Sequence, residues 1–334
     1  MRDKIDIVIL WVDGNDKKWQ KKKNFWQHEY GIEIDTPERY RDWDNLKYTF
    51  RGIEKFAPWV NHIYLVTDNQ RPKWISTDHS KLTIVDHTDI IDKDCLPTFN
   101  SRAIEVNMHR IPNLSSQFVY LNDDMFFIKK TSPTDFFEDG LPKETAVLNP
   151  IFAHKNVGIS KVMYNNLAII NDYFKKNKTI KEHPLKWFSF KNGPLLFRTL
   201  LMMGPSYFTG FYEPHLNSNF LKSTFEDVWS SYEEELLETT QSRFRKDSNN
   251  NQWLFKYWQF ACNNFVPRTY NFGKVYNLSD AKSIEQCANH IRRQKTKLVC
   301  VNDTERLEDF NKAKETVNKA FETILAEKSE FEKN

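Results

Sequence analysis

The residues of this chain best suited to chemistry are two adjacent aspartates, Asp123 and Asp124, which interrupt an apolar run. Residues 118–121 before the pair and 125–127 after it are aliphatic or aromatic, as in a buried strand. Neighbouring carboxylates repel each other, and burying either one without a partner costs free energy. A divalent cation that bridges them to a phosphorylated substrate would compensate that cost. We therefore predict that Asp123 and Asp124 bind a metal ion, Asp124 foremost; the alternative is a solvated strand end.

A second acidic turn lies near the N-terminus. Residues 5–12 form an apolar, strand-like run that leads directly into Asp13, Gly14 and Asp16. In open α/β sheets, ligands collect beyond the carboxyl ends of the strands, so two strands that each end in aspartates predict one shared crevice. The alternative at this position is a simple turn from strand to loop.

Several other positions carry groups that suit phosphate chemistry, although each is also compatible with a solvated surface. Asp303 follows another apolar run and repeats the pattern of a strand that ends in an acidic turn. Arg245 offers a two-pronged donor for phosphate oxygens, and His215 titrates near the pH at which a base for a hydroxyl group is useful. Lys47 and Arg51 are spaced i, i+4, which suits a pyrophosphate but is also common on solvated helices.

Composition excludes several classes of protein. The 334 residues include 48 basic and 45 acidic ones, a net charge of +3, which makes nucleic acid an improbable main partner. The four cysteines are scattered without a C-x-x-C pair, which argues against a zinc site or a disulfide framework and favours a reducing compartment. The sequence shows neither a signal-peptide pattern nor an apolar run of about 18 residues, so we expect a soluble or peripheral protein.

The order of the apolar runs predicts an α/β fold across residues 5–150. Strands are expected at 5–12, 62–67, 82–85 and 118–121, and helices at 46–56 and 101–110. Because no repeat, low-complexity tract or long linker interrupts the chain, we expect a single catalytic domain over residues 1–334.

The second half of the chain is less regular. Residues 151–210 are rich in Asn, Lys, aromatic residues and Pro, and they are expected to form a variable insertion that faces the acceptor. Residues 211–304 would complete the active site, with helices predicted at 224–240 and 252–263. A charged amphipathic helix is expected over residues 305–333, as a packing element.

Several common catalytic motifs are absent from the sequence. The chain lacks G-x-x-x-x-G-K-[ST], which excludes a P-loop, and it lacks G-x-G-x-x-G, which makes a nicotinamide oxidoreductase improbable. Neither G-x-S-x-G nor H-E-x-x-H occurs, which disfavours a serine esterase or a zinc hydrolase. The remaining chemistry is that of carboxylates, histidine and arginine.

Three stretches carry a family resemblance: residues 5–16, 41–70 and 99–124. Together with looser matches at 213–215, 244–245 and 300–303, they resemble the Stealth proteins, which are bacterial capsular and exopolysaccharide sugar-1-phosphate transferases similar to the animal N-acetylglucosamine-1-phosphotransferase. The strong matches cover most of residues 5–128, whereas about 150–210 has no counterpart. Many family members have histidine where this chain has Arg102, which makes an essential histidine there doubtful.

The resemblance implies a fold, a reaction and a setting. The expected fold is a nucleotide-sugar transferase of the GT-A-like type, an α/β mixed sheet flanked by helices. The expected reaction moves a hexose or N-acetylhexosamine 1-phosphate from a UDP-sugar to a glycan hydroxyl and releases UMP. Mg²⁺ or Mn²⁺ is the implied cofactor, and the implied acceptor is a lipid-linked oligosaccharide or polysaccharide. This places the protein in the cytoplasm, with peripheral association to the inner face of the membrane.

The resemblance also implies roles for individual residues. Asp303 joins Asp123 and Asp124 as a metal ligand. His215 would be the general base or would bind the reacting phosphate, and Asp303 is the rival base. Arg245 would bind phosphate, and Glu105, one helical turn from Arg102, would reach the metal or the donor sugar unless it is an exposed helix position. The residues expected to bind the donor nucleotide and its pyrophosphate are Asp13, Gly14, Lys47, Arg51 and Arg102.

Two other functions fit the same sequence. A conventional glycosyltransferase would use the same metal and UDP-sugar but attack the anomeric carbon and release UDP, and fold alone does not separate the two reactions. A non-catalytic carbohydrate-binding protein is the alternative from another class, since 10 Trp and 13 Tyr offer stacking faces for sugars. That alternative leaves the aspartate pair unexplained.

Overall fold

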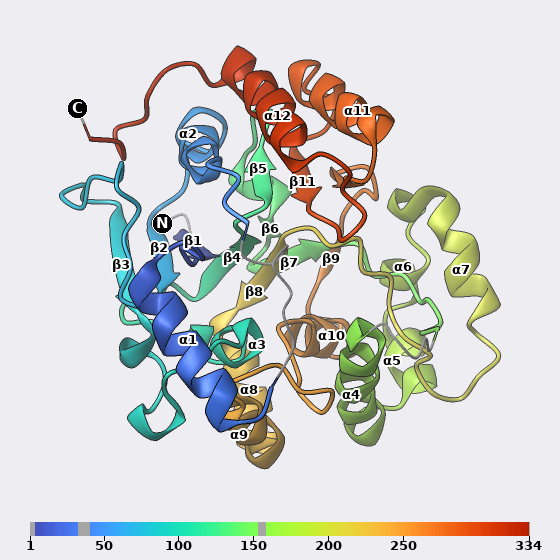
Figure 1. Ribbon diagram of the computed structural model, residues 1–334. Coiled ribbons are helices and arrows are strands. Elements are labelled where there is room, and N and C mark those ends of the chain that lie inside the picture. Colours follow the sequence, from blue (N-terminus) through green and yellow to red (C-terminus); the bar gives the residue numbers. More distant parts are fainter. Residues whose placement is uncertain (1–3, 33–40, 153–157, 334) are drawn as a thin grey trace.

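A five-stranded mixed sheet lies at the centre of the computed structural model, which describes residues 4–32, 41–152 and 158–333 (Figure 1). In spatial order its strands are β3 (Leu82–Asp86), β2 (Ile63–Thr67), β1 (Ile5–Leu10), β4 (Gln117–Asn122) and β8 (Ser218–Leu221). The first four run parallel, and β8 pairs with β4 in the antiparallel direction. The predicted α/β class and its mixed sheet are confirmed.

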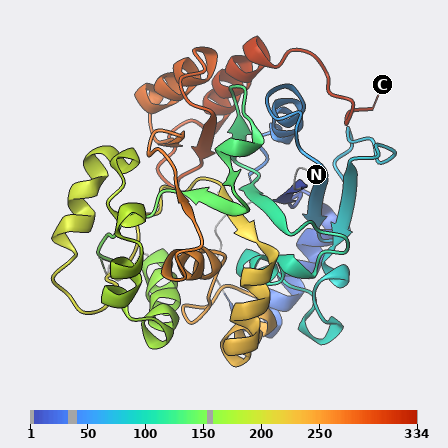
Figure 2. The same ribbon diagram turned by 180° about the vertical axis from the view of Figure 1, so that it is seen from behind.

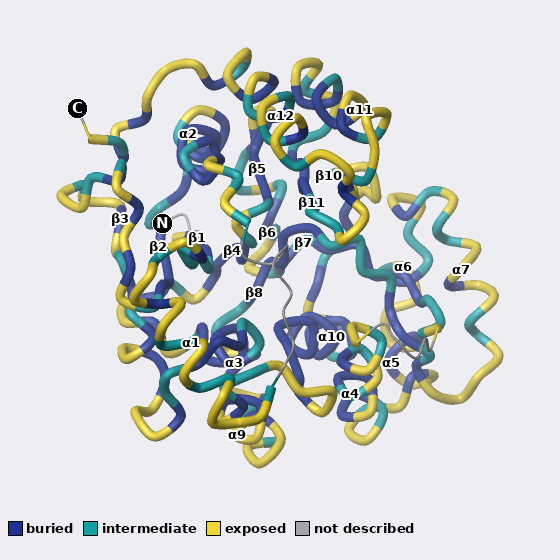
Figure 3. The backbone as a smooth tube through the Cα atoms, viewed as in Figure 1, coloured by how far each residue is buried: buried dark blue, intermediate teal, exposed yellow. Residues whose placement is uncertain are grey.

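Helices cover both faces of this sheet because its strands are apolar on both sides. Along β1, Ile7 and Ile9 pack into one hydrophobic cluster and Val8 into the other. Figure 3 shows the strands of this sheet mostly buried, with the exposed backbone concentrated on the outer sides of the molecule. The helices of the first cluster's side are α2 (Leu46–Phe56), α11 (Ala281–Arg292) and α12 (Phe310–Ile324). Those of the second are α3 (Ser101–Glu105), α8 (Lys222–Ser231), α9 (Glu233–Gln241) and α10 (Trp253–Ala261).

A small sheet extends the fold directly beyond the aspartate pair. It is ordered β10 (Gly273–Asn277), β11 (Leu298–Asn302) and β5 (Met125–Phe127). Cys300 pairs with Met125, and the amide of Val301 donates to the carbonyl of Asp124 at 2.9 Å. This pairing brings the end of β11, and with it Asp303, to the same place as Asp123 and Asp124.

The third sheet is ordered β6 (Phe137–Glu138), β7 (Leu141–Glu144) and β9 (Val266–Pro267). Short 3₁₀ turns connect several elements: His87–Asp89, Lys93–Cys95, Met108–Arg110, Pro133–Asp135 and Phe190–Leu195.

The insertion at 151–210 is helical throughout its regular parts; its residues 153–157 lie outside the described residues. Its elements are α4 (Gly158–Tyr173), α5 (Lys176–Glu182), α6 (Pro184–Trp187) and α7 (Leu196–Leu201). Helix α4 packs against α10, and the group forms one end of the molecule, seen from behind in Figure 2.

Several predicted helix boundaries are wrong. The helix expected at 101–110 ends at Glu105 and continues only as a 3₁₀ turn, and the one expected at 224–240 breaks at Tyr232 into α8 and α9. The C-terminal helix is also shorter than predicted: it begins after Asp309, whose side chain accepts from the amide of Lys312 and caps it. Helix α1 (Lys17–Glu29) was not predicted, because only Trp19 on it is buried and its apolar pattern is weak.

Candidate active site

The acidic turns after β1 and β4 open into one pocket. Leu10 and Asn122 are partners in the strand register, so the residues that follow the two strands emerge side by side. A pocket of about 210 Å³ is lined by residues from both turns and from the end of β11, among them Asp13, Gly14, Asp123, Asp124 and Asp303. The predicted shared crevice is therefore confirmed.

A larger cavity of about 420 Å³ adjoins this pocket. The two cavities share Asp123 and Asp124, so the aspartate pair lies where they meet. The larger one continues over α3 and the loops near residues 215 and 245. Besides the aspartate pair, four of the predicted site residues line it: Arg102, Glu105, His215 and Arg245.

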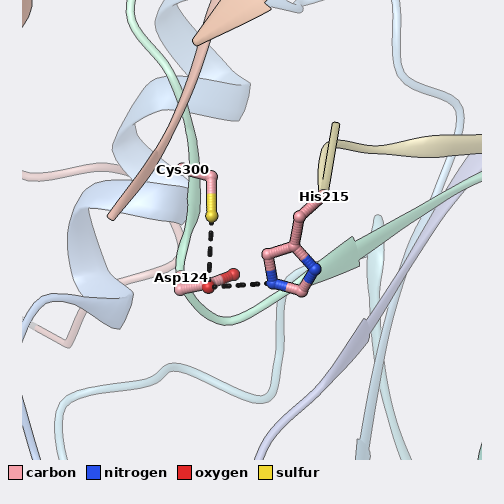
Figure 4. Close-up of side chains that lie close together, drawn as sticks. All are labelled: Asp124, His215 and Cys300. Carbon is pink, nitrogen blue, oxygen red and sulfur yellow. Dashed lines mark hydrogen bonds and ion pairs between the residues drawn. The ribbon is translucent and has the colours of Figure 1, made fainter. Parts of the chain in front are cut away.

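Asp124 lies at the centre of a compact polar group with His215 and Cys300 (Figure 4). Its Oδ2 atom is 3.5 Å from His215 Nε2 and accepts a hydrogen bond of 3.2 Å from the Cys300 thiol. Burial, together with the nearby charge of Asp124, raises the pKa of Cys300 well above its ordinary value. The thiol is thus protonated at neutral pH and acts as a donor that orients the carboxylate.

The aspartate pair has the properties of an incomplete cation site. Asp124 Oδ1 is buried and makes no hydrogen bond with any described residue, which is costly for a carboxylate oxygen. Enclosure within the cleft and the charge of Asp124 raise the pKa of Asp123 to about 7. A divalent cation with oxygen ligands would satisfy the unpaired oxygen and relieve the repulsion. The residues present therefore fit Mg²⁺ or Mn²⁺.

The predicted metal ligands do not all lie within ligand distance of one another. Within the described ranges, the three candidate ligand atoms that lie within 4.8 Å of one another belong to Asp124, His215 and Cys300. Asp303 lines the same pocket as the aspartate pair, but Arg41 Nη1 and Trp43 Nε1 each donate to its carboxylate at 3.3 Å. Metal binding by Asp123, Asp124 and Asp303 remains a prediction.

His215 is held in an unusual backbone conformation beside the aspartate pair. Its φ of +50° lies in the left-handed region, which non-glycine residues seldom adopt. Although the His215 side chain is 40% exposed, partial removal from water in the cleft disfavours the charged imidazolium; the hydrogen bond and charge of Asp124 outweigh this effect and raise the pKa of His215 above its ordinary value. Glu213 and Glu105 act in the same direction.

A buried ionic network fixes the loop that carries His215. Glu213 accepts a hydrogen bond of 3.1 Å from Lys256 on α10, and both side chains are 3% exposed. Lys256 also lies 3.6 Å from Glu144, which in turn pairs with Arg268 at 3.1 Å. Because these groups are removed from water, each depends on its partners, and they anchor the chain two residues before His215.

Three other predicted residues surround the larger cavity. Arg245 is exposed and donates to Ser101 Oγ at 2.7 Å, and Arg102 donates to the carbonyl of Lys246 at 2.8 Å. Glu105 is buried and accepts from the amide of Gln252 at 3.2 Å, so the alternative of an exposed helix position is wrong.

Asp13, which is predicted to bind the nucleotide, is fixed by Gln70, whose Oε1 accepts from the Asp13 amide at 2.8 Å and whose Nε2 donates to the Asp13 carbonyl at 3.0 Å. Gly14 is buried in the wall of the smaller pocket.

The structure does not bring Lys47 and Arg51 to either cavity. Arg51 is buried, and its Nε and Nη2 atoms donate to the two carboxylate oxygens of Glu332 at 2.7 and 2.9 Å. Its Nη1 atom donates to the carbonyl of Leu325. Lys47 lies over the ring of Tyr48, 5.3 Å from its centroid. Lys47 and Arg51 therefore do not form the expected i, i+4 phosphate-binding pair. Arg51 instead holds the C-terminal segment against α2.

We expect Arg51→Ala to lower the free energy of unfolding by about 2–3 kcal/mol, because charged hydrogen bonds are lost and the Glu332 carboxylate, whose side chain is 5% exposed, loses its arginine partner. Chemical denaturation measures this effect. Lys47→Ala is the matched control, with a change below about 0.5 kcal/mol. The KM for the donor should be unchanged in both variants, and a large rise in KM for Arg51→Ala at unchanged stability would restore its predicted role in pyrophosphate binding.

Sequence reasoning missed Cys300, Arg41 and Trp43. Cys300 lies two residues before Asn302 on β11, so the two side chains lie on the same side of the strand. This spacing was the signal in the sequence that Cys300 lies near the acidic turn at the end of the strand. Arg41 and Trp43 gave no signal of contact with Asp303, which is more than 250 residues away in the sequence.

Comparison with known proteins places the chain in a family. The family models for Stealth protein conserved regions 1 and 2 match residues 3–31 and 39–144. Capsular polysaccharide phosphotransferase WcwK of Streptococcus pneumoniae is 38% identical, over 99% of this chain and 98% of the relative. Exopolysaccharide phosphotransferase cps2G of Lactiplantibacillus plantarum is 41% identical, over 98% and 96%.

Two further comparisons cover nearly the whole chain. Receptor polysaccharide phosphotransferase WefC of Streptococcus gordonii is 42% identical, over 99% of this chain and 100% of the relative. Among solved structures, the galactosyltransferase LgtC shows a distant similarity over 96% of both chains, with 10% identity and a TM-score of 0.43. With relatives of this identity matched over almost their full length, the chain belongs to the Stealth family.

Proposed function

We propose that this protein is a phosphotransferase of capsule or exopolysaccharide synthesis. It moves a hexose or N-acetylhexosamine 1-phosphate from a UDP-sugar to a hydroxyl of a glycan acceptor, which forms a phosphodiester and releases UMP. The observation that carries the proposal is the aspartate pair at the junction of two cavities, with an unsatisfied carboxylate oxygen and a histidine beside it. The phosphotransferase names of its relatives support the same reaction.

Asp123 and Asp124, with Asp303 in the same pocket, would hold Mg²⁺ or Mn²⁺. When bound, such an ion neutralises charge on the pyrophosphate. The donor nucleotide would lie on the side of Asp13 and Gly14, so that its pyrophosphate reaches the aspartate pair. Arg245 and Arg102 line the larger cavity and would present positive charge to phosphate oxygens there.

His215 is proposed as the general base. With its Nε2 proton directed at Asp124 Oδ2, its Nδ1 atom is free to accept the proton of the acceptor hydroxyl. The hydroxyl oxygen then forms a bond to the phosphorus, and the bond from phosphorus to the UMP oxygen breaks. Asp124 stabilises the resulting imidazolium, and Cys300 keeps the carboxylate in position. Asp303 is the rival base, and Glu105 is close enough to contribute to the charge around His215.

The released nucleotide tests this proposal. Purified protein is incubated with Mg²⁺, a panel of UDP-sugars and a glycan acceptor, and the nucleotide product is identified by chromatography. We expect UMP, and we expect EDTA to abolish its release until Mg²⁺ or Mn²⁺ is restored. UDP as the product would show a glycosyltransferase instead. Metal-dependent binding of a UDP-sugar without turnover of any acceptor would leave a binding protein.

The setting of the reaction is also a proposal. A nucleotide-sugar donor and a glycan acceptor follow from the relatives, and a lipid-linked acceptor would place the protein in the cytoplasm, at the inner face of the membrane. Across the described part of the chain, no helix has the length and apolar character needed to cross a bilayer.

A further inference from the structure

The insertion presents large apolar side chains to solvent. Along 17 residues of α6, the following 3₁₀ turn and α7, five side chains are largely exposed: Leu185 (86%), Phe190 (92%), Phe197 (70%), Leu200 (50%) and Leu201 (75%). Single exposed apolar residues are ordinary, but a concentration of this kind marks a surface that binds another body. These residues lie at the end of the molecule that the insertion forms (Figure 2).

Helix α7 exposes apolar side chains and buries a polar one, the reverse of the pattern in an ordinary surface helix. Thr199 is fully buried, and its hydroxyl accepts a hydrogen bond from the amide of Leu148. Phe197, Leu200 and Leu201 instead face outwards. Surface helices of globular proteins bury their apolar side chains and expose polar ones. Nothing in the described parts of the chain covers the apolar side of α7, so its natural partner is apolar and external.

The surroundings of this apolar stretch are strongly cationic. Residues 151–210 contain nine Lys and Arg against two acidic residues, a net charge of +7, whereas the whole chain carries only +3. Lys191, which directly follows Phe190, also lines a cavity of about 390 Å³ on this side of the protein. The cationic residues of that cavity are Lys129, Lys143, Lys191, Arg268, Lys295 and Lys297.

Much of this positive charge has no internal partner. Lys297 pairs with Asp135, the acidic residue among those that line the cavity, and Lys143 pairs with Glu138. Within the described residues, the ammonium groups of Lys129, Lys191 and Lys295 make no hydrogen bond or ion pair. These ammonium groups suit a partner with anionic groups on its surface, and the exposed aromatic and leucine side chains suit a partner with an apolar interior.

We propose that the face formed by α6, the 3₁₀ turn at Phe190–Leu195 and α7 docks on an anionic lipid bilayer. Its apolar side chains enter the upper acyl region, and the lysines around Lys191 contact lipid phosphates. A second copy of the chain is a poorer partner, because a symmetric contact would place the same positive charges against each other. Docking itself does not depend on the proposed reaction, whereas its use in presenting a lipid-linked acceptor does.

The position of the face suits that use. Helix α4 begins the described part of the insertion, and Ile159 on it lines the larger cavity beside the aspartate pair. The insertion therefore connects the docking face with the cleft. A glycan attached to a lipid in the same bilayer would approach the cavity from the insertion side.

Vesicle co-sedimentation of the full chain tests the proposal without any substrate. We expect binding to vesicles of phosphatidylcholine with phosphatidylglycerol, at least tenfold weaker binding to phosphatidylcholine alone, and weakening as salt is raised. Phe197→Ser/Leu201→Ser and, separately, Lys191→Glu/Lys295→Glu should each lower binding at least tenfold. Phe25→Ser on α1 is the matched control, since Phe25 is 58% exposed on another element and its loss should change nothing.

Thermal unfolding and UMP release with a water-soluble acceptor show whether the variants remain folded and active, and both should match wild type. Failure of wild-type protein to bind anionic vesicles, equal binding to both vesicle types, or unaltered binding by either double variant overturns the proposal. So does a shift from dimer to monomer in the variants, which would identify the face as a contact between copies. Absence of UMP release with intact vesicle binding would instead refute the proposed reaction alone.

Discussion

Replacing His215 by asparagine should lower the rate of UMP release about a thousandfold, the usual loss when a general base is removed. Asparagine is the appropriate substitution because it tolerates the left-handed backbone that His215 adopts at φ +50°. The His215 side chain is 40% exposed, so the loss of its packing should change stability little. Steady-state UMP release, with circular dichroism to confirm the fold, measures the effect.

A matched control is His183→Asn, since this exposed histidine on the insertion lines neither cavity of the site. Its activity should equal that of the wild type. Near-normal turnover in His215→Asn would remove His215 from the mechanism. Asp303 would then be the candidate base, and the Asp303→Asn variant should show the large loss.

Loss of metal binding without loss of fold in Asp124→Asn would separately support the proposed cation site.

Lys256→Met should lower the free energy of unfolding by about 3–5 kcal/mol, the cost of removing one partner from a buried ion pair. Methionine fills a similar volume, so the effect reports the lost charge more than lost packing. Glu213 and Glu144 would remain, and only Glu144 keeps a cationic partner, Arg268. Urea denaturation at fixed pH measures the change. Activity should also fall, because this network anchors the loop of His215.

The effect of Lys256→Met should depend on pH. Burial raises the pKa of Glu213 from 4.5 to about 7, although the charge of Lys256 opposes this rise. The folded protein thus holds more protons than the unfolded chain between these values, and the contribution of Glu213 to stability falls as the pH rises from about 4.5 to 7. Without Lys256 this pKa rises further, so the variant should lose more stability at pH 8 than at pH 6.

Removing the opposing charge should rescue the variant. Lys256→Met/Glu213→Gln leaves no uncompensated charge at this point and should recover most of the lost stability, with little remaining dependence on pH. A double variant as unstable as Lys256→Met would show that packing, and not charge, sets the role of Lys256.

Much of the central sheet followed from local sequence patterns. Apolar runs that end in Asp13 and Asp123 predicted β1 and β4, and the rule that ligands collect at the carboxyl ends of strands predicted their common crevice. Helix α2 has the predicted bounds because its apolar positions recur with helical spacing. These features depend on neighbouring residues alone, so they can be predicted from a single sequence.

The partners of the charged residues were beyond such patterns. The spacing of Lys47 and Arg51 suggested a phosphate site, but Glu332, 281 residues further along the chain, binds Arg51. The sequence left open whether Glu105 faces the site or the solvent, and only the fold showed that it is buried and accepts from the amide of Gln252. A charged side chain on a helix has the same local sequence whether its partner is water, a ligand or a distant carboxylate, and only the folded chain decides between them.

By itself, the sequence determined the class of fold, the aspartate pair and the family resemblance, because these reside in short contiguous stretches. Only the tertiary structure decided that Cys300 and His215 meet at Asp124, since β11 must pair with β5 to place Cys300 there and β8 must pair with β4 to place the loop of His215. It also decided that α7 turns its leucines outwards, because the contact of Thr199 with Leu148 fixes the rotation of the helix. Periodicity shows that a helix has an apolar side, whereas long-range packing determines whether that side faces the protein core or the solvent.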